Sequence, residues 1–248
     1  MQKLMVLSSL GIVVGLAGTV VTAQQGDAPS AYSAQGGQRS YEVAGFETIS
    51  AIGPNDVVVS VGPAVSVRAE GDPDALDKYE VVVEDGELKI QPKRDSGWGF
   101  GWDDVKPAKF YVTMPQISAA TLIGSGDMKV DRVDGGRFSA TVTGSGQLDI
   151  AALSVDDAKL TIAGSGDLTA RGRARTSEIS IAGSGDVLAR ELTSDTAAVS
   201  IAGSGDAALT VQGNANVSIV GSGDVDIAGD ARCTVTRMGS GEVRCNEG

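Results

Sequence analysis

Apolar and polar residues alternate with a period of two through most of the second half of the chain. Ser180 lies between Ile179 and Ile181, and Thr161 lies between Leu160 and Ile162. Alternation of this kind is typical of β-strands with one buried face, and β-branched residues dominate the apolar set. The pattern therefore predicts strands rather than helices, with the isoleucines, valines and leucines on the buried side.

A four-residue motif interrupts these strands at regular intervals. Successive copies are offset by 20, 20, 19, 20, 18 and 18 residues, which is the signature of a repeat protein with one coil per repeat. We therefore predict an all-β fold, a right-handed parallel β-helix-like solenoid of about 18–20 residues per coil whose coils stack at the ~4.8 Å spacing of paired strands. The motifs begin at Gly124, Gly144, Gly164, Gly183, Gly203, Gly221 and Gly239; each reads Gly-Ser-Gly followed by Asp, Gln or Glu.

The region before the motifs predicts shorter and less regular strands. Residues 79–83 and 88–91 flank the hairpin turn Glu84-Asp85-Gly86, and residues 73–78 are compatible with one helical turn. Gly53-Pro54-Asn55-Asp56 reads as a turn between two strands. We expect this region to begin the same solenoid with irregular coils and to cover its N-terminal end.

The N-terminus predicts an exported protein. Lys3 precedes an uncharged apolar run, and Val21-Thr22-Ala23 offers small residues at the positions that a signal peptidase reads. A membrane anchor is the competing interpretation, because the apolar run is long enough to span a bilayer. We predict a signal peptide at 1–23, a flexible leader at 24–40, and a single solenoid domain at 41–248. Irregular coils would occupy 41–118, and motif coils 119–248.

The overall charge excludes some partners. The chain has a formal net charge of −12, and an acidic chain of this kind repels nucleic acid. No second apolar segment is long enough to span a membrane after signal cleavage.

There is no histidine, which removes the common catalytic triads and histidine zinc sites. We expect no cofactor and no metal site, and the sequence leaves the oligomeric state open.

The last coil differs from the others in a way that predicts a cap. Cys233 and Cys245 fall on the buried parity, and Arg237 replaces the apolar residue found at this position in earlier coils. An exported protein meets an oxidising compartment, so a disulfide between the two cysteines is the default expectation. Such a bridge would seal the end of the stack.

The acidic residue that follows most motifs allows two interpretations. A ladder of carboxylates on stacked coils could bind Ca²⁺, which takes several carboxylate oxygens. Alternatively, each carboxylate accepts hydrogen bonds from nearby backbone N–H groups at the turn. The second interpretation is favoured, because one carboxylate per coil makes a poor cage and Gln147 interrupts the series.

An aromatic insert is the best candidate for contact with a ligand or partner. It holds Trp98, Phe100 and Trp102, separated by glycines that indicate a loop. Such rings stack on sugars and anchor protein interfaces, but they can also fold back over the solenoid. The adjacent carboxylates Asp103-Asp104 and Asp156-Asp157 fit poorly with glycoside hydrolysis, since neighbours in a strand point to opposite faces.

The order of these features resembles one family of exported bacterial proteins, the putative auto-transporter adhesin, head GIN domain family. The segments that carry the resemblance are Phe46-Glu47-Thr48-Ile49, Asp56-Val57-Val58-Val59, Val65-Ser66-Val67, Asp85-Gly86-Glu87-Leu88-Lys89-Ile90, Val112-Thr113-Met114-Pro115 and the serial motifs. The resemblance spans about 41–245 and implies a β-helix-like fold and export. It implies no catalytic residues.

We therefore expect a non-catalytic domain of the periplasm or cell surface, with an adhesive or scaffolding role. The leading hypothesis is a binding module for an envelope protein or glycan, using a solenoid face and the aromatic insert. A polysaccharide-acting enzyme and a purely structural spacer are the alternatives.

Overall fold

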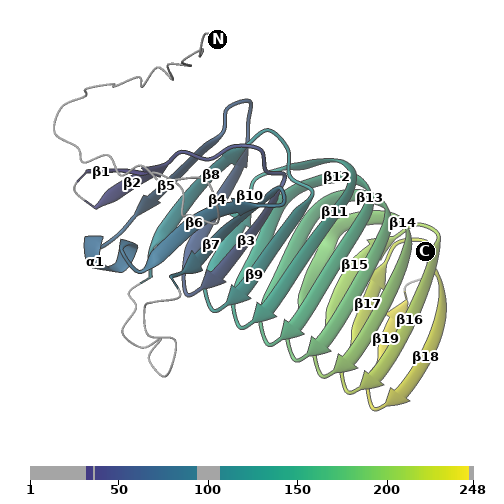
Figure 1. Ribbon diagram of the computed structural model, residues 1–248. Coiled ribbons are helices and arrows are strands. Elements are labelled where there is room, and N and C mark those ends of the chain that lie inside the picture. Colours follow the sequence, from purple (N-terminus) through teal and green to yellow (C-terminus); the bar gives the residue numbers. More distant parts are fainter. Residues whose placement is uncertain (1–31, 36, 94–106, 246–248) are drawn as a thin grey trace, which may run out of the picture.

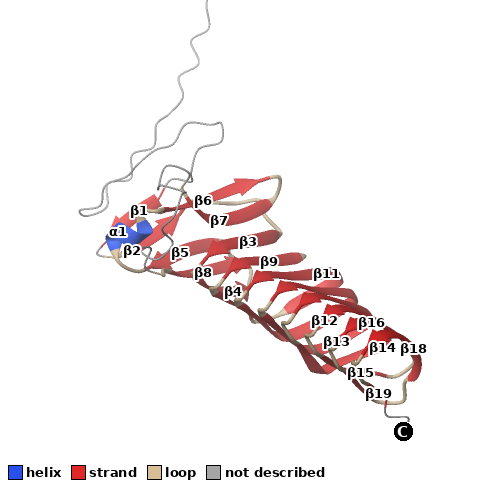
Figure 2. Ribbon diagram, turned by 90° about the horizontal axis from the view of Figure 1, so that it is seen from below, coloured by secondary structure: helices blue, strands red, loops and turns tan. Residues whose placement is uncertain are grey.

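The computed structural model describes residues 32–35, 37–93 and 107–245, which form a β-solenoid of about six turns. Two walls of parallel strands enclose a continuous apolar core (Figures 1 and 2). The predicted solenoid is therefore confirmed. Among the described residues, no helix is long and apolar enough to cross a membrane.

The first wall consists of the strand segments that lead into the motifs. Its strands pair in parallel with no shift of register along the wall, so equivalent residues of successive coils lie side by side (Figure 1). In order along the wall they are β3 (Thr48–Gly53), β9 (Ala119–Gly124), the later parts of β11 (Val133–Gly144), β12 (Gln147–Gly164), β13 (Asp167–Gly183) and β14 (Val187–Gly203), then β16 (Asn214–Gly221) and β18 (Arg232–Gly239).

The second wall consists of the strand segments that follow the motifs, together with two strands that precede the first motif. The long strands β12, β13 and β14 contribute to both walls, and the register shifts where β12 and β13 bend between Ile150 and Leu153. In order, the second wall holds β8 (Lys109–Met114), β4 (Asp56–Val61), β10 (Asp127–Val130), the beginnings of β12, β13 and β14, then β15 (Ala207–Val211), β17 (Val225–Ala228) and β19 (Val243–Cys245).

Antiparallel strands close the N-terminal end of the solenoid. The predicted hairpin is confirmed, because the positive φ angles of Asp85 (51°) and Gly86 (79°) make the tight turn, and the predicted helical turn is the short α1. The elements at this end are β1 (Tyr32–Gln35), β2 (Gln38–Tyr41), β5 (Ser66–Glu70), α1 (Pro73–Leu76), β6 (Tyr79–Glu84) and β7 (Glu87–Pro92).

Two strands lie within the region predicted as a flexible leader, since β1 begins at Tyr32 and β2 at Gln38. Strand β2 pairs in antiparallel fashion with β1 and with β5. Arg39 is buried and forms an ion pair with Asp77, and its guanidinium lies 4.8 Å from the centre of the Tyr32 ring. Asp77 lies 38 residues from Arg39 along the chain, so the local composition of the leader could not reveal this partner.

The core is built from the residues that the alternation placed inside. Leu160, Ile162, Ile179 and Ile181 are each 0–1% exposed. In register, each stacks on its counterpart in the next coil, so every coil buries the apolar face of its neighbour. Because each coil buries the apolar residues of its neighbour, the coils share one continuous core and are not separate folding units.

Candidate functional site

Each Gly-Ser-Gly motif forms a sharp corner between the two walls. The first glycine of the motif has a positive φ angle, for example 139° at Gly183 and 143° at Gly203, where a side chain would be strained. At both glycines of each corner, a Cβ atom would approach a backbone carbonyl of the preceding coil to well under 3.0 Å. The glycines therefore allow backbones to stack closely at the corner.

An eighth corner lies beneath the seven motif corners, at a place where the sequence indicated only a turn. Gly53 and Asn55 occupy the positions of the two motif glycines, so that Gly124 stacks on Gly53 and Gly126 stacks on Asn55. The N–H groups of Ser125 and Gly126 both donate to the Gly53 carbonyl at 3.3 Å, as equivalent groups do in later coils. The N-terminal region thus shares the corner geometry of the repeats.

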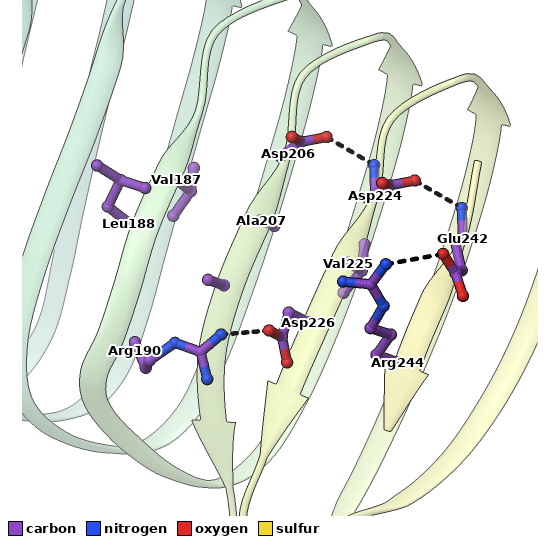
Figure 3. Close-up of a pocket in the computed structure, with 11 residues that line it drawn as sticks. Val187, Leu188, Arg190, Asp206, Ala207, Asp224, Val225, Asp226, Glu242 and Arg244 are labelled. Carbon is purple, nitrogen blue, oxygen red and sulfur yellow. Dashed lines mark hydrogen bonds and ion pairs between the residues drawn. The ribbon is translucent and has the colours of Figure 1, made fainter. Parts of the chain in front are cut away.

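The acidic residues after the motifs accept hydrogen bonds from the backbone of the next coil. Asp186 Oδ1 accepts from the N–H of Asp206 at 2.8 Å. Asp206 Oδ1 accepts from the N–H of Asp224 at 2.7 Å, and Asp224 Oδ1 from that of Glu242 at 2.7 Å (Figure 3). Each carboxylate thus satisfies a donor that the corner leaves without a strand partner. These bonds favour the interpretation in which the carboxylates accept backbone hydrogen bonds over the one in which they bind Ca²⁺.

The interruption of this ladder at Gln147 has a structural counterpart. In the coils of Gln147 and Asp167, the strands begin directly after the corner, and these two residues already pair in register. The N–H of Asp167 donates to the Gly146 carbonyl at 3.1 Å instead of to a side chain. A carboxylate acceptor is therefore unnecessary at Gln147.

A shallow hollow of about 200 Å³ lies on the second wall near these carboxylates (Figure 3). Its charges are already paired: Arg190 bonds Asp226, and Arg244 bonds Glu242 at 3.0 Å. The Glu242 carboxylate raises the pKa of Arg244 further above its usual value. In the described part of the chain, no three potential metal ligands come together.

The outward surface of the first wall near the corners is free of charge. Three rows of seven residues run along it, one hydroxyl-bearing, one mainly aliphatic, and one of motif serines at the corner; we call this surface the hydroxyl face. All its members are partly or fully exposed. They are Thr121, Thr141, Thr161, Ser180, Ser200, Ser218 and Thr236; Ile123, Thr143, Ala163, Ala182, Ala202, Val220 and Met238; and Ser125, Ser145, Ser165, Ser184, Ser204, Ser222 and Ser240.

The second wall carries the charges that the hydroxyl face lacks. Arg171 bonds Asp149 at 2.6 Å and lies 3.7 Å from Glu191, across neighbouring coils. Together with the acidic ladder, these pairs make the second wall polar and charged. The first wall carries charge only outside the three rows, as at the Lys159–Glu178 ion pair of 2.7 Å, so the hydroxyl face is an uncharged strip beside charged neighbours.

Trp98, Phe100 and Trp102 lie outside the described residues, as does the carboxylate pair at 103–104. Of the other pair, Asp157 lies 3.2 Å and Asp156 4.0 Å from the guanidinium of Arg175. These two carboxylates therefore interact with a cation rather than flank an open cleft.

The predicted disulfide between Cys233 and Cys245 is confirmed, with 6.5 Å between the two Cα atoms. It joins β18 to β19 across the C-terminal end of the solenoid. In register, the two cysteines occupy the positions of the buried Ala215 and Ile227 in the preceding coil. The bridge therefore holds the two walls together where no further coil covers the core among the described residues.

Comparison with known proteins decides the family. The profile described as "Putative auto-transporter adhesin, head GIN domain" matches residues 45–231, which is three quarters of the chain. The chain belongs to this family. Among curated proteins, none matches the chain.

Solved structures share the fold of this head GIN domain protein. A putative adhesin from Bacteroides fragilis NCTC 9343 has a TM-score of 0.74 at 19% identity, covering 83% of this chain and 94% of its own. A putative lipid binding protein from Parabacteroides distasonis ATCC 8503 has a TM-score of 0.66 at 22% identity, with the same coverage. A putative adhesin from Parabacteroides merdae ATCC 43184 has a TM-score of 0.63 at 16% identity, covering 84% of this chain and 95% of its own.

Sequence reasoning missed the hydroxyl face of this head GIN domain protein, although its signal was present. The polar parity of a single strand, as at Thr161 or Ser180, predicts an outward polar side chain but does not show that the whole row lacks charge. Reading the same positions across coils would have shown that no lysine, arginine, aspartate or glutamate occurs in these rows. The absence of charge becomes visible only when equivalent positions are compared between coils rather than along one strand.

Proposed function

We propose that this head GIN domain protein is an exported, non-catalytic, adhesin-like module that binds an extended glycan of the cell envelope through its hydroxyl face. The observation that carries the proposal is the absence of charge along three rows of seven residues, in a chain of which 21% of residues are charged. Export is supported by the predicted signal peptide, the disulfide and the family.

The chemistry of the hydroxyl face suits a neutral polysaccharide. Sugar rings present apolar C–H faces and hydroxyl edges, and the face offers an aliphatic row between two hydroxyl rows. The rows repeat at the ~4.8 Å spacing of paired strands, so seven coils extend them over about 29 Å. A long ligand can therefore make the same weak contact many times, which gives avidity without a deep pocket.

A non-catalytic role agrees with the arrangement of the carboxylates. Those of the ladder accept backbone hydrogen bonds, and Asp156 and Asp157 lie beside Arg175. Carboxylates committed in this way are poorly suited to act as the acid and nucleophile of glycoside cleavage.

The proposal is tested by adding charge to the centre of the hydroxyl face. The purified protein is assayed for binding to isolated cell-wall sacculi and to a panel of neutral bacterial polysaccharides. Ala182→Arg with Ala202→Arg should weaken binding about tenfold or more, because the arginines break the uncharged contact surface. Ala208→Arg, on the second wall, is the matched control and should leave binding unchanged.

Equal binding by the double variant and the control would refute a role for the hydroxyl face. The aromatic insert is tested separately with Trp98→Ala and Trp102→Ala together. If the insert contributes to the contact, binding falls while the melting temperature stays the same. Unchanged binding would remove the insert from the proposal.

A further inference from the structure

At the C-terminal end of the solenoid, the last coil has a strand edge without a pairing partner among the described residues. In the described part of the chain, β18 pairs only with β16, and β19 pairs only with β17. Val235 of β18 is 43% exposed, whereas Val217, its counterpart in the preceding coil, is 3% exposed. The N-terminal end, by contrast, is closed by antiparallel strands and α1 (Figure 2).

The free edge of β18 has backbone groups available for another strand. The N–H of Arg232 donates to Gly213 at 2.7 Å and that of Ser240 donates to Gly221 at 3.0 Å, so even-numbered residues face the preceding coil. In a parallel ladder, successive N–H groups point to opposite sides. The N–H groups of Val235 and Arg237 therefore point toward the open edge, where an added strand would find them.

The charge at this end is opposite to that of the protein. Residues 232–245 contain three arginines and one glutamate, a net charge of +2, although the whole chain has −12. The preceding stretch, residues 214–231, contains three aspartates and no lysine or arginine. The last coil therefore carries a net positive charge on an anionic protein, which favours an acidic partner at its free edge.

Arg237 decides which strands this edge can accept. It pairs in register with Ile219, which is 1% exposed, and its guanidinium donates to the Gly241 carbonyl at 3.0 Å. A strand placed over it without a carboxylate would bury an unpaired charge, which is costly. A second copy of the chain would bring its own Arg237, and an inward-pointing charge is a known device against such edge-to-edge pairing.

We infer that the free edge of β18 is a docking site for an extended acidic peptide, which adds a strand to the first wall. Main-chain hydrogen bonds to Val235 and Arg237 would supply affinity. An apolar residue of the peptide would cover Val235, and a carboxylate would pair with Arg237. The site uses the backbone edge and the inward residues of β18, whereas the hydroxyl face uses outward side chains such as Thr236, so the inference does not depend on the proposed glycan contact.

The experiment measures peptide binding to the full protein with its disulfide intact. The probe is a fluorescein-labelled octapeptide of alternating threonine and valine, in which one central valine is glutamate; matched peptides carry glutamine or lysine there. Fluorescence anisotropy at low salt should show the glutamate peptide binding about tenfold or more tightly than the glutamine peptide, and the lysine peptide weakest.

Two variants test the two parts of the site. Arg237→Gln should abolish the preference for glutamate over glutamine. Val235→Pro, which removes one edge N–H without touching the bonds to β16, should weaken all peptides. Arg175→Gln is the matched control for the loss of an arginine elsewhere and should change nothing. Circular dichroism checks that each variant folds; if Val235→Pro does not fold, the altered preference of Arg237→Gln decides the question.

Equal binding of the three peptides, or a glutamate preference that survives Arg237→Gln, would overturn the inference. So would a concentration-dependent dimer, measured by sedimentation, that Val235→Pro abolishes while no peptide binds, since the occupant would then be a second copy. Binding to phosphatidylglycerol vesicles without peptide binding would likewise overturn it, because the edge would then serve a lipid surface.

Discussion

Substituting one motif glycine by alanine tests whether close backbone stacking at the corners holds the solenoid together. Gly185 is suitable because its φ angle is not among the positive ones, so that the added Cβ introduces a clash without backbone strain. The Cβ would overlap the Gly166 carbonyl oxygen and lie 3.0 Å from Cγ2 of Ile162. The overlap can be relieved only if two coils move apart.

The expected magnitude follows from the bonds around this corner. The N–H of Ser184 donates to Gly164 at 2.8 Å, that of Gly185 donates to the same carbonyl at 3.2 Å, and Asp186 accepts from Asp206 at 2.8 Å. Each is worth about 1 kcal/mol, and overpacking of the core costs about 1–3 kcal/mol more. If all three bonds are lost, we expect Gly185→Ala to lower the free energy of unfolding by about 4–6 kcal/mol.

The assay is urea unfolding followed by far-UV circular dichroism, with the disulfide intact. Two glycines of β11 serve as controls that separate the effect of a steric clash from that of backbone strain. Gly136→Ala adds a Cβ whose nearest neighbour is Asp156 Oδ2 at 3.8 Å, and should be neutral or stabilise by about 0.5 kcal/mol. Gly135→Ala meets no atom within 4 Å but has a φ angle of 148°, so it measures backbone strain alone. If Gly185→Ala unfolds at the same urea concentration as Gly136→Ala, the stacking argument is refuted.

Variants at three further sites test other contacts by the same unfolding assay. Asp206→Ala should cost about 1–2 kcal/mol, because the N–H of Asp224 loses its acceptor, whereas Asp206→Asn keeps an acceptor and should cost less; equal losses would contradict the ladder. Replacing Cys233 and Cys245 by alanine should cost about 2–3 kcal/mol, as should reduction of the wild type, and an unchanged midpoint would show that the bridge does not hold the end. Burial raises the pKa of Tyr79, against a smaller lowering by Asn55, so its stabilising contribution is present below the usual value of about 10 and is lost as pH rises through the raised pKa. Tyr79→Phe should therefore weaken the alkaline loss of stability and change little at pH 7, and parallel pH profiles would contradict this.

The repeat, the buried parity and the disulfide could be read from the sequence because they depend on local information. Alternation of apolar and polar residues, as around Ser180, shows which face of a strand is buried, and the same alternation recurs in each coil. The hairpin at Asp85-Gly86 was equally local, since both residues favour the positive φ angles that the turn requires.

Features that involve distant segments could not be read in this way. Whether Gly53 begins a corner depends on Gly124 stacking on it, and whether Arg39 is buried depends on Asp77. No local pattern at either residue reports such a partner.

The sequence alone determined that the chain coils, with which period and with which side chains inside, because burial of alternating residues is decided strand by strand. Only the tertiary structure decided that the uncharged rows form an exposed surface of one wall and that the edge of β18 at Arg237 is left open in the described part of the chain. Both depend on the register between coils, which places residues about twenty positions apart side by side.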